Sequence, residues 1–556
     1  MRLTPLAKAF ITLVVLVVVG YTGYHYFGDQ IRCWSSPERC VETASKPGRP
    51  ASQADQPKAD PSVNREDFNA LANAPADPGK AGVTGVAAAT ITGGKLGRPL
   101  RVGINTWAGH APGIVANLGL APGKAGSIYT KAGLQVELTV IDDPVAKFAA
   151  FQAGQIDVMW DTVDSWAREA SILAERGNVR GRAILMEDWS RGGDGVVALA
   201  SIKSVEDLKG KKIATTEFTP SHWLLLYLLN QSGLSPDDKK AIEKSLIITQ
   251  DAPAAAAMFK SKKVDAAVTW EPDLSGAVEA RGDEAHILVS TMAATNVIAD
   301  VLVARQDVID QAPGTMAAFV AGWFEAIDYM KKDPQGSNAV VGDALKLDGE
   351  TVSGMLSGLK LTPFADTAQF FGLTSGKAHF ETLFDTAFRI WRKKGVVTRA
   401  VDAKDQYDAR FVAATADRYR GQVVVEPALA AKRPSEKDVP IINKTLSINF
   451  TPGSDEIMPG SFFTLDSLGE TMISFGQTYL RVEGNTDATG SHDKNVQLSQ
   501  KRADAVRAYL VKEFKVPAER FQTLGRGPDN PIAPNATEAG RQLNRRTDIK
   551  VVLANK

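Results

Sequence analysis

Residues 482–510 read VEGNTDATGSHDKNVQLSQKRADAVRAYL, and this stretch organises the C-terminal part of the chain. Alternating polar and apolar side chains over 478–484 predict a strand that leads into a turn rich in Thr, Gly and Ser. After the turn, apolar residues recur at helical spacing, so the predicted helix buries one face. This spacing allows the carboxylate of Asp487, after the strand, and the guanidinium of Arg502, on the helix, to meet one zwitterionic ligand.

Several spaced motifs around this stretch form one pattern between about residue 440 and residue 556. In this pattern the chain resembles the peptidoglycan-binding domain of the OmpA family. The resemblance implies that Asp487 and Arg502 hold the ammonium and carboxylate groups of diaminopimelate in the cell-wall peptide, beside Thr486 and Asn495. The alternative is that Asp487 caps a turn and Arg502 forms a surface ion pair. The motifs are INFTPGSDEIMPGS (448–461), GNTDATG (484–490), NVQLSQKRADAV (495–506), LGRGPDNPIAPN (524–535) and GRQLNRRTDIKV (540–551).

The composition indicates a globular protein with more than one domain. The chain has 556 residues, whereas ordinary domains have about 100–200. Its hydrophobic share of 44% supplies enough apolar material for a core. Lys and Arg total 64, and Asp and Glu also total 64, so no excess of one sign attracts the chain to nucleic acid or to an anionic membrane surface. We therefore expect no nucleic-acid partner.

The N-terminal stretch predicts a membrane anchor. Residues 9–27 read AFITLVVLVVVGYTGYHYF, which is roughly the length needed to span a bilayer. Arg2 and Lys8 precede this run, which places residues 1–8 in the cytoplasm and sends the rest of the chain outward. A cleavable signal peptide is the alternative, although no clear A-x-A site follows the run. We expect a single-pass inner-membrane protein with most of its chain in the periplasm.

Residues 28–98 are predicted to be a periplasmic linker. Cys33 and Cys40 are the two cysteines of the chain, and a local disulfide between them is expected in the oxidising periplasm. This stretch offers too few further ligands for a metal site. From residue 41 onward it is rich in Ala, Pro, Gly, Ser, Lys and Asp and has little periodicity, which is typical of a flexible spacer.

An α/β pattern extends from residue 99 to residue 395. Strand and helix patterns alternate through this region, as in a mostly parallel sheet flanked by helices, and a second such unit begins near residue 204. The region resembles the type II periplasmic solute-binding proteins of ABC importers, nearest to the nitrate, sulfonate, taurine and thiamine-precursor binders. The resemblance implies two α/β lobes that close on a solute. It is carried by GINTWAGHAPGIVAN (103–117), KAGLQVELTVIDDPVAKFAAFQAGQIDV (131–158), SVEDLKGKKIATTEFTPSHWLL (204–225) and FKSKKVDAAVTWEP (259–272).

Ligands of open α/β sheets bind beyond the carboxyl ends of the strands, and this rule selects the candidate solute site. The helix predicted to begin after Thr219, its expected N-cap, offers backbone N–H groups to an oxyanion. Alternatively, aromatic and acidic side chains form a cage for a cationic amine. Packing between the lobes for the Trp residues, and a structural role for His222, are the competing interpretations. The selected residues are Trp107, Asp161, Trp189, Glu217, Ser221, His222, Trp270 and Glu271.

The sequence predicts binding rather than catalysis. A relative of this binding fold that makes a thiamine precursor is expected to carry a cysteine-rich motif, whereas residues 99–395 contain no cysteine. The sequence has no HExxH motif, no Ser-His-Asp order and no clustered metal ligands. The Gly-rich WSRGGDGVV (189–197) lacks the phosphate-loop pattern. We expect no enzymatic activity, no cofactor and no metal.

The predicted architecture is a two-lobed α/β solute-binding domain at 99–395, a connector at 396–440 and an α+β OmpA-like domain at 441–556, preceded by one transmembrane helix. The expected partners are peptidoglycan, a small-molecule solute and the inner membrane, with an ABC permease as a further candidate. The alternative is a structural cell-wall tether, or a sensor whose binding lobe serves signalling rather than import.

Overall fold

The structure is a computed structural model that describes residues 91–92, 94–177, 179–374, 378–425 and 433–553. The predicted anchor at 9–27, the predicted disulfide between Cys33 and Cys40 and nearly all of the linker lie outside these residues. None of the helices in the described part is long and apolar enough to cross a membrane. A hairpin of β1 (Ile91–Thr92) and β2 (Lys95–Leu96) begins the described chain.

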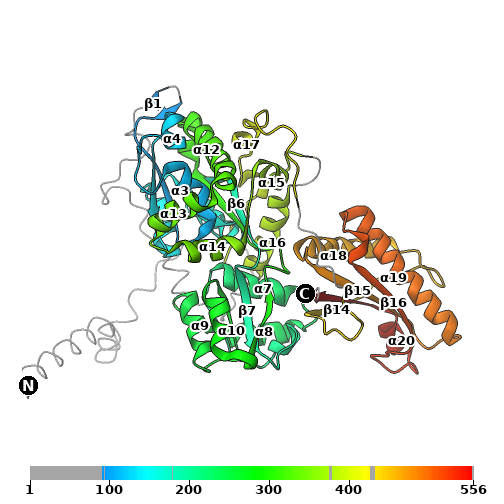
Figure 1. Ribbon diagram of the computed structural model, residues 1–556. Helices are drawn as coiled ribbons and strands as arrows, with labels where there is room; N and C mark the ends of the chain where they lie inside the picture. Colours follow the sequence, from blue (N-terminus) through cyan, green and yellow to red (C-terminus); the bar gives the residue numbers. More distant parts are fainter. Residues whose placement is uncertain (1–90, 93, 178, 375–377, 426–432, 554–556) are drawn as a thin grey trace, which may run out of the picture. The chain divides into compact units, whose positions relative to one another are not determined.

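A six-stranded sheet forms the centre of the first lobe, which comprises residues 94–190 and 299–425, and helices pack around it (Figure 1). The strand order is β13-β6-β12-β5-β3-β4. The expected parallel pairing holds for β3 with β4 and β5, whereas β12 is antiparallel to both of its neighbours because it returns from the second sheet. The strands are β3 (Leu100–Ile104), β4 (Val136–Val140), β5 (Val158–Thr162), β6 (Gly181–Ser190), β12 (Ala299–Arg305) and β13 (Leu359–Leu361).

The helices of the first lobe come from two separate parts of the chain. Those before β6 are α3 (Ala111–Asn117), α4 (Ile128–Lys131), α5 (Pro144–Gln152) and α6 (Val163–Arg176). Those after β12 are α11 (Gln306–Gln311), α12 (Pro313–Lys332), α13 (Pro334–Leu345), α14 (Gly349–Ser357), α15 (Phe364–Phe370), α16 (His379–Lys393) and α17 (Arg410–Ala413).

A five-stranded sheet forms the second lobe, residues 194–290, in the order β11-β7-β10-β8-β9. Here β8 is parallel to β9 and β10, and β7 is antiparallel to β10 and β11. The strands are β7 (Asp194–Leu199), β8 (Ile213–Thr215), β9 (Ile247–Ile248), β10 (Ala266–Trp270) and β11 (Ala285–Ser290). The helices are α7 (Pro220–Gln231), α8 (Pro236–Lys244), α9 (Ala252–Lys260) and α10 (Asp273–Arg281).

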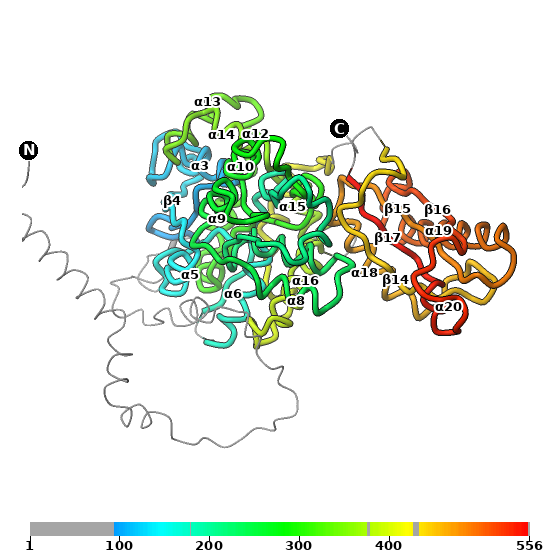
Figure 2. Tube along the Cα trace, turned by 90° about the horizontal axis from the view of Figure 1, so that it is seen from below, coloured from blue at the N-terminus to red at the C-terminus, as the bar shows by residue number. Residues whose placement is uncertain are grey.

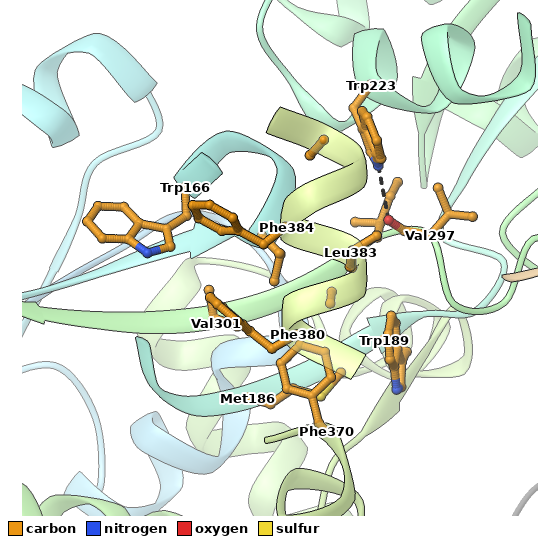
Figure 3. Packing of buried hydrophobic residues seen from close by; sticks show 14 of the residues in the cluster. Trp166, Met186, Trp189, Trp223, Val297, Val301, Phe370, Phe380, Leu383 and Phe384 are labelled. Atoms are coloured by element: carbon orange, nitrogen blue, oxygen red, sulfur yellow. Dashed lines mark hydrogen bonds between the residues drawn. The ribbon is translucent and has the colours of Figure 1, made fainter. Parts of the chain in front are cut away.

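Two crossings connect the lobes. The first crossing, residues 191–193, leads from β6 to β7, and the second crossing, residues 291–298, leads from β11 back to β12. The indole of Trp223 in α7 donates a hydrogen bond to the carbonyl of Val297 in the second crossing at 3.0 Å (Figure 3). Phe380 and Phe384 of α16 belong to the same buried cluster, so the apolar core continues from the first lobe to the second crossing.

The C-terminal domain is a four-stranded sheet in the order β14-β17-β15-β16, with β15 parallel to β16 and antiparallel to β17. The trace in Figure 2 runs from β14 through α18, β15 and α19 to β16, and then through α20 to β17. The strands are β14 (Ile442–Leu446), β15 (Thr478–Asn485), β16 (Phe521–Gly527) and β17 (Thr547–Leu553). The helices are α18 (Phe462–Ser474), α19 (His492–Phe514) and α20 (Glu538–Asn544).

Strand β15 is buried at every position, although its sequence alternates between polar and apolar residues. The carboxylate of Glu483 accepts hydrogen bonds from Arg526 at 2.9 Å and from Lys550 at 2.6 Å. Burial alone would raise the pKa of Glu483, but these two cations outweigh it and lower the pKa. Ion pairing with the flanking strands therefore keeps the polar face of β15 charged inside the domain, directly before the loop that carries Asp487.

Candidate functional site

The loop after β15 holds Asp487 between charged partners. Its Oδ2 accepts a hydrogen bond from Arg545 at 2.6 Å, and its Oδ1 accepts one from the backbone N–H of Thr489 at 2.8 Å. Partial burial opposes ionisation, but these hydrogen bonds outweigh it, so the pKa of Asp487 lies below its usual value. Asp487 is thus a carboxylate at neutral pH.

Arg502, near the middle of α19, lies in the same cluster as Asp487, and we call the set of Asp487, Arg502 and Arg545 the C-terminal cluster. Its Nε donates to the carbonyl of Ser454 at 3.0 Å, and its guanidinium carbon lies 4.9 Å from the centre of the Phe450 ring. No residue in the described part of the chain accepts a hydrogen bond from its two terminal nitrogens. Burial and the nearby charge of Arg545 lower the pKa of Arg502, and Asp487 raises it. The charge of Asp487 therefore acts on Arg502, but the residue that donates a hydrogen bond to the Asp487 side chain is Arg545.

Asn495 and Thr486 support the loop. The amide of Asn495 donates to the carbonyls of Asp487 at 3.4 Å and Thr489 at 3.0 Å, which fixes the loop against α19. Thr486 donates its backbone N–H to Gly527 of β16 at 2.9 Å. Ser491 occupies the N-cap position of α19, and its side chain makes no capping hydrogen bond.

A second polar cluster lies at the strand ends of the first lobe. Asp161, at the end of β5, accepts hydrogen bonds from Lys147 Nζ at 3.2 Å and from the N–H of Thr162 at 2.9 Å. Lys147 lies 4.7 Å from the centre of the Trp160 ring, and the indole N–H of Trp160 donates to Asp300 at 2.6 Å. Asp161 and Lys147 are both about 2% exposed, so this ion pair is removed from water.

Trp107 joins the same cluster from the loop after β3. Its indole N–H donates to Asp188 Oδ2 at 3.2 Å, and its ring packs against Met355 and Leu359. A Cβ at Gly109 would lie 1.8 Å from Asp188 Oδ2, so only glycine allows the backbone to approach this carboxylate. The register of β6 and β12 places Asp188 opposite Asp300, which brings two acids together in the sheet.

His110 connects the cluster to a further buried acid. Its Nδ1 lies 2.6 Å from Glu187 Oε2, and its Nε2 lies 2.6 Å from Asn105 Oδ1. The ring of His110 meets that of Trp160 edge-on, with 5.7 Å between centroids. We call the set formed by Trp107, His110, Lys147, Trp160, Asp161, Glu187, Asp188 and Asp300 the strand-end cluster.

Burial dominates the electrostatics of this part of the molecule. It raises the pKa of Asp188 and Asp300 well above the ordinary value, and the mutual repulsion of neighbouring carboxylates adds to the effect. Burial also raises the pKa of Asp194 to about 6, that of Asp164 to about 7 and that of Glu169 to about 8. The described residues of the two lobes bury more acids than strong cations. The buried cations are Lys147, Arg168 and Lys394, and the buried acids include Asp161, Asp164, Glu169, Glu187, Asp188, Asp194 and Asp300.

The other predicted solute-site residues are spread over three places. Glu217 and His222 line a small cavity of about 50 Å³ together with Lys394. His222 accepts a hydrogen bond from the N–H of Phe218 at 3.2 Å, and burial, followed by the charges of Lys394 and Arg168, lowers its pKa, so the ring is neutral. Ser221 is buried in the first turn of α7, next to His222.

Trp189, Trp270 and Glu271 do not join that cavity. Trp189 packs into the core against Phe370, with 5.6 Å between ring centroids (Figure 3). Trp270 ends β10 and is half-buried. Glu271 accepts a hydrogen bond from the backbone N–H of Ser275 at 3.1 Å in the first turn of α10.

The N-terminus of α7 differs from the expected oxyanion site. Thr219 stands at the N-cap position, but its hydroxyl donates to the carbonyl of Thr216 at 2.7 Å and does not cap the helix. Pro220 removes one of the first N–H groups. A larger cavity of about 660 Å³, beside α12, α14 and β13, contains none of the predicted site residues.

Comparison with known proteins finds a family match for each of the two regions of the chain. Residues 449–545 match the OmpA family, and residues 123–337 match the family described as NMT1/THI5 like. The probable lipoprotein YiaD of Escherichia coli (strain K12) is 39% identical over 109 residues, which are 20% of this chain and 49% of the relative. Outer membrane porin F of Pseudomonas aeruginosa is 34% identical over 111 residues, 20% of this chain and 32% of the porin. The chain thus spans half or less of the length of these two relatives.

Two further similarities concern the solute-binding region. A protein of Brucella abortus (strain 2308) that is named as a binding protein is 27% identical over 257 residues, 45% of this chain and 72% of that protein. The crystal structure of the periplasmic aliphatic sulphonate binding protein SsuA from Escherichia coli aligns with a TM-score of 0.44 and 19% identity, over 56% of this chain and 97% of SsuA. The predicted fusion is confirmed: an OmpA-family domain follows an NMT1/THI5-like domain in one chain.

Proposed function

We propose that this chain, which joins an OmpA-family domain to an NMT1/THI5-like domain, is a cell-envelope protein with two binding functions. Its C-terminal domain binds the diaminopimelate of peptidoglycan, and its two lobes capture a small solute without catalysing a reaction. One observation carries the wall-binding function: Asp487, ionised and about 9% exposed, lies in the same cluster as Arg502, whose two terminal nitrogens have no acceptor in the described part of the chain.

The chemistry of the C-terminal cluster suits a zwitterion. The planar fork of Arg502 meets a carboxylate through two parallel hydrogen bonds, and Phe450 beneath it limits the directions in which it points. Asp487 offers its oxygens to an ammonium group while Arg545 keeps it ionised. Asn495 holds the backbone of this loop, so Asp487 needs little rearrangement to bind.

The charge balance of the strand-end cluster favours a solute with a positively charged group. Buried carboxyl groups outnumber buried strong cations there, and a cation that enters between them replaces the protons that the acids otherwise retain. The α7 N-terminus is less suited to an anion, because Pro220 removes one of its first N–H groups, and Lys394 in the adjacent cavity is already paired with Glu243 at 3.0 Å. We infer that lobe closure around the solute follows the hinge motion of two-lobed binding proteins.

The setting that we propose is an inner-membrane anchor at 9–27, a disulfide between Cys33 and Cys40, and both binding regions in the periplasm. In this arrangement an ABC permease or a signalling partner receives the loaded solute-binding domain. Membrane fractionation followed by N-terminal sequencing tests the anchor, and a mature chain that begins after Phe27 would overturn it.

The wall-binding function is tested by co-sedimentation of the full chain with purified sacculi. Arg502→Ala should bind about ten- to a hundredfold more weakly, because a charge-assisted hydrogen bond contributes roughly 1.5–3 kcal/mol. Arg507→Ala, on the same helix, is the matched control and should bind like the unmodified protein. Undiminished pelleting of Arg502→Ala would remove the assignment.

The solute-binding function is tested by calorimetry with a panel of amines, sulfonates, nitrate and pyrimidines. We expect an amine-containing compound to bind. If only sulfonates or nitrate bind, the domain binds anionic solutes, and the proposed preference for a positively charged group is wrong. If no compound binds, the structural tether becomes the better description of the protein.

A further inference from the structure

The two crossings lie against each other between the lobes. Ser190 Oγ and Thr291 Oγ1 are 2.8 Å apart, and the N–H of Gly192 donates to the same Thr291 hydroxyl at 2.9 Å. Arg191 donates to Asn296 Oδ1 at 2.8 Å. Because lobe closure is absorbed by a few residues in such connections, the contacts that hold the crossings also control how far the lobes move.

The C-terminal end of α18 holds the second crossing. The side chain of Asn296 donates to the carbonyl of Ile473 at 2.9 Å, and its backbone N–H donates to the carbonyl of Ser474 at 3.1 Å. The N–H of Gly476 donates in return to Thr295 Oγ1 at 3.0 Å. The last four carbonyl groups of a helix receive no hydrogen bond from N–H groups of the same helix. Asn296 supplies a donor to two of these carbonyls in α18.

Further hydrogen bonds attach the C-terminal domain to the second lobe. Thr471 Oγ1 donates to Gln231 Oε1 at 2.9 Å, and both side chains are buried. One oxygen of Glu206 accepts hydrogen bonds from the N–H of Gly233 at 2.9 Å and from the N–H of Asn443 at 3.2 Å. The domain is therefore bound to the second lobe and to the second crossing at the same time.

We propose that the C-terminal domain is a clamp on the hinge of the solute-binding domain, which limits the opening and closing of the two lobes. A domain that is fixed to the second lobe and also bonded to residues 295 and 296 resists rotation of the backbone at those residues. Release of the clamp frees the second crossing and widens the range of lobe positions. The proposal goes beyond the two binding functions and requires neither ligand.

Two glycines at the contact make the clamp accessible to a steric test. A Cβ at Gly233 would lie 2.1 Å from the carbonyl oxygen of Asn443, which is backbone and cannot turn away. A Cβ at Gly476 would lie 2.5 Å from Thr295 Oγ1. Gly460, in the same domain, has no atom within 4 Å of the corresponding position and is the matched control.

The experiment measures the distance between spin labels in the two lobes of the full chain, with Cys33→Ser and Cys40→Ser in the background. The labels are placed at Glu350→Cys in α14 and Lys240→Cys in α8, which are both exposed. The unmodified contact should give a narrow distance distribution. Gly233→Ala and Gly476→Ala should broaden it, and Gly460→Ala should leave it unchanged.

Hydrogen exchange supplies a readout that does not depend on the glycine variants. Asn296→Ala removes the side-chain donor, and amide exchange over 294–297 should become about fivefold faster or more. If Gly233→Ala does not fold, the distance distribution of Gly476→Ala and the amide exchange of Asn296→Ala test the clamp. Equal distance distributions and equal exchange in all folded variants would overturn the clamp. A failure to pellet with sacculi would instead overturn only the wall-binding function.

Discussion

Asp487 in the C-terminal domain and Asp188 in the solute-binding domain are both carboxyl groups close to the end of a strand, yet their surroundings act on them in opposite directions. Asp487 is about 9% exposed, but it accepts a hydrogen bond from the guanidinium of Arg545, and its pKa is lowered. Asp188 is fully buried, faces Asp300 and receives one indole N–H, and its pKa is raised. The C-terminal cluster is charged before its ligand arrives, whereas the charge of the strand-end cluster depends on what enters it.

The largest expected effect concerns the free energy of unfolding of the solute-binding domain, which should decrease as the pH rises. The pKa of Asp164 is about 7 in the folded state, above its ordinary value of 3.8, because the side chain is buried. The stability that protonated Asp164 contributes is complete below about pH 4 and is lost as the pH rises through about 7. This shift corresponds to about 4 kcal/mol at 1.36 kcal/mol per pKa unit.

Urea unfolding monitored by tryptophan emission checks this prediction, because every Trp except Trp34 lies between residues 107 and 391. The urea concentration at the unfolding midpoint should decrease as the pH is raised from 5 to 8.5. In Asp164→Asn this decrease should be smaller. The exposed Asp283→Asn is the control and should behave like the unmodified chain. An unchanged pH dependence in Asp164→Asn would show that Asp164 is ionised in the folded domain.

The next effect concerns the charged cluster of the C-terminal domain. Asp487→Ala and Arg502→Ala should each weaken sacculus binding about ten- to a hundredfold. If the two side chains hold opposite ends of one zwitterion, the double variant should lose less than the sum of the single losses. Co-sedimentation of the four proteins measures this coupling, and strictly additive losses would mean that the residues bind separate groups.

The sequence was most informative where the partners are close along the chain. Asp487 and Arg502 are separated by one loop and about the first three turns of one helix, so their spacing indicated a common site. Arg545 was missed as a partner of Asp487 because it lies 58 residues away, although it is part of the quoted GRQLNRRTDIKV motif. Its adjacency depends on how β17 pairs with β15, which no local pattern specifies.

The strand-end cluster was predicted only in part for the same reason. The strand-end rule selected Trp107 and Asp161, but Glu187, Asp188, Asp300 and Lys147 were not selected. Asp188 and Asp300 meet because β12 returns antiparallel between β5 and β6, and this register joins residues 112 positions apart. Trp189 points the other way, into the core, because successive side chains of a strand alternate between its faces.

A smaller effect distinguishes the strand-end cluster by the sign of its pH dependence. If an amine binds there, its affinity should decrease as the pH is lowered from 8 to 5.5. Asp194, whose charge acts on Asp188 and Asp300 of the cluster, has a pKa of about 6 and becomes neutral over this range. For a carboxyl group with a pKa of about 6, the ionised share falls about fourfold over this range, and the affinity should fall by a similar factor. Calorimetry at both pH values measures the change, and an affinity that rises on acidification would indicate an anionic solute.

The smallest effect tests how Arg545 acts on Asp487. Arg545 donates to Asp487 at 2.6 Å and to Glu538 at 2.8 Å, with a different terminal nitrogen for each. Lys has a single nitrogen on a flexible stem, so Arg545→Lys preserves the charge but weakens the simultaneous hold on both carboxylates. If Arg545 positions Asp487 for the ligand, Arg545→Lys should weaken sacculus binding about two- to fivefold, equivalent to roughly 0.5–1 kcal/mol. If Arg545 competes with the ligand's ammonium group for Asp487, the same variant should bind more tightly. Co-sedimentation of Arg545→Lys beside Arg507→Lys, a matched change on α19, separates these two roles by the direction of the shift.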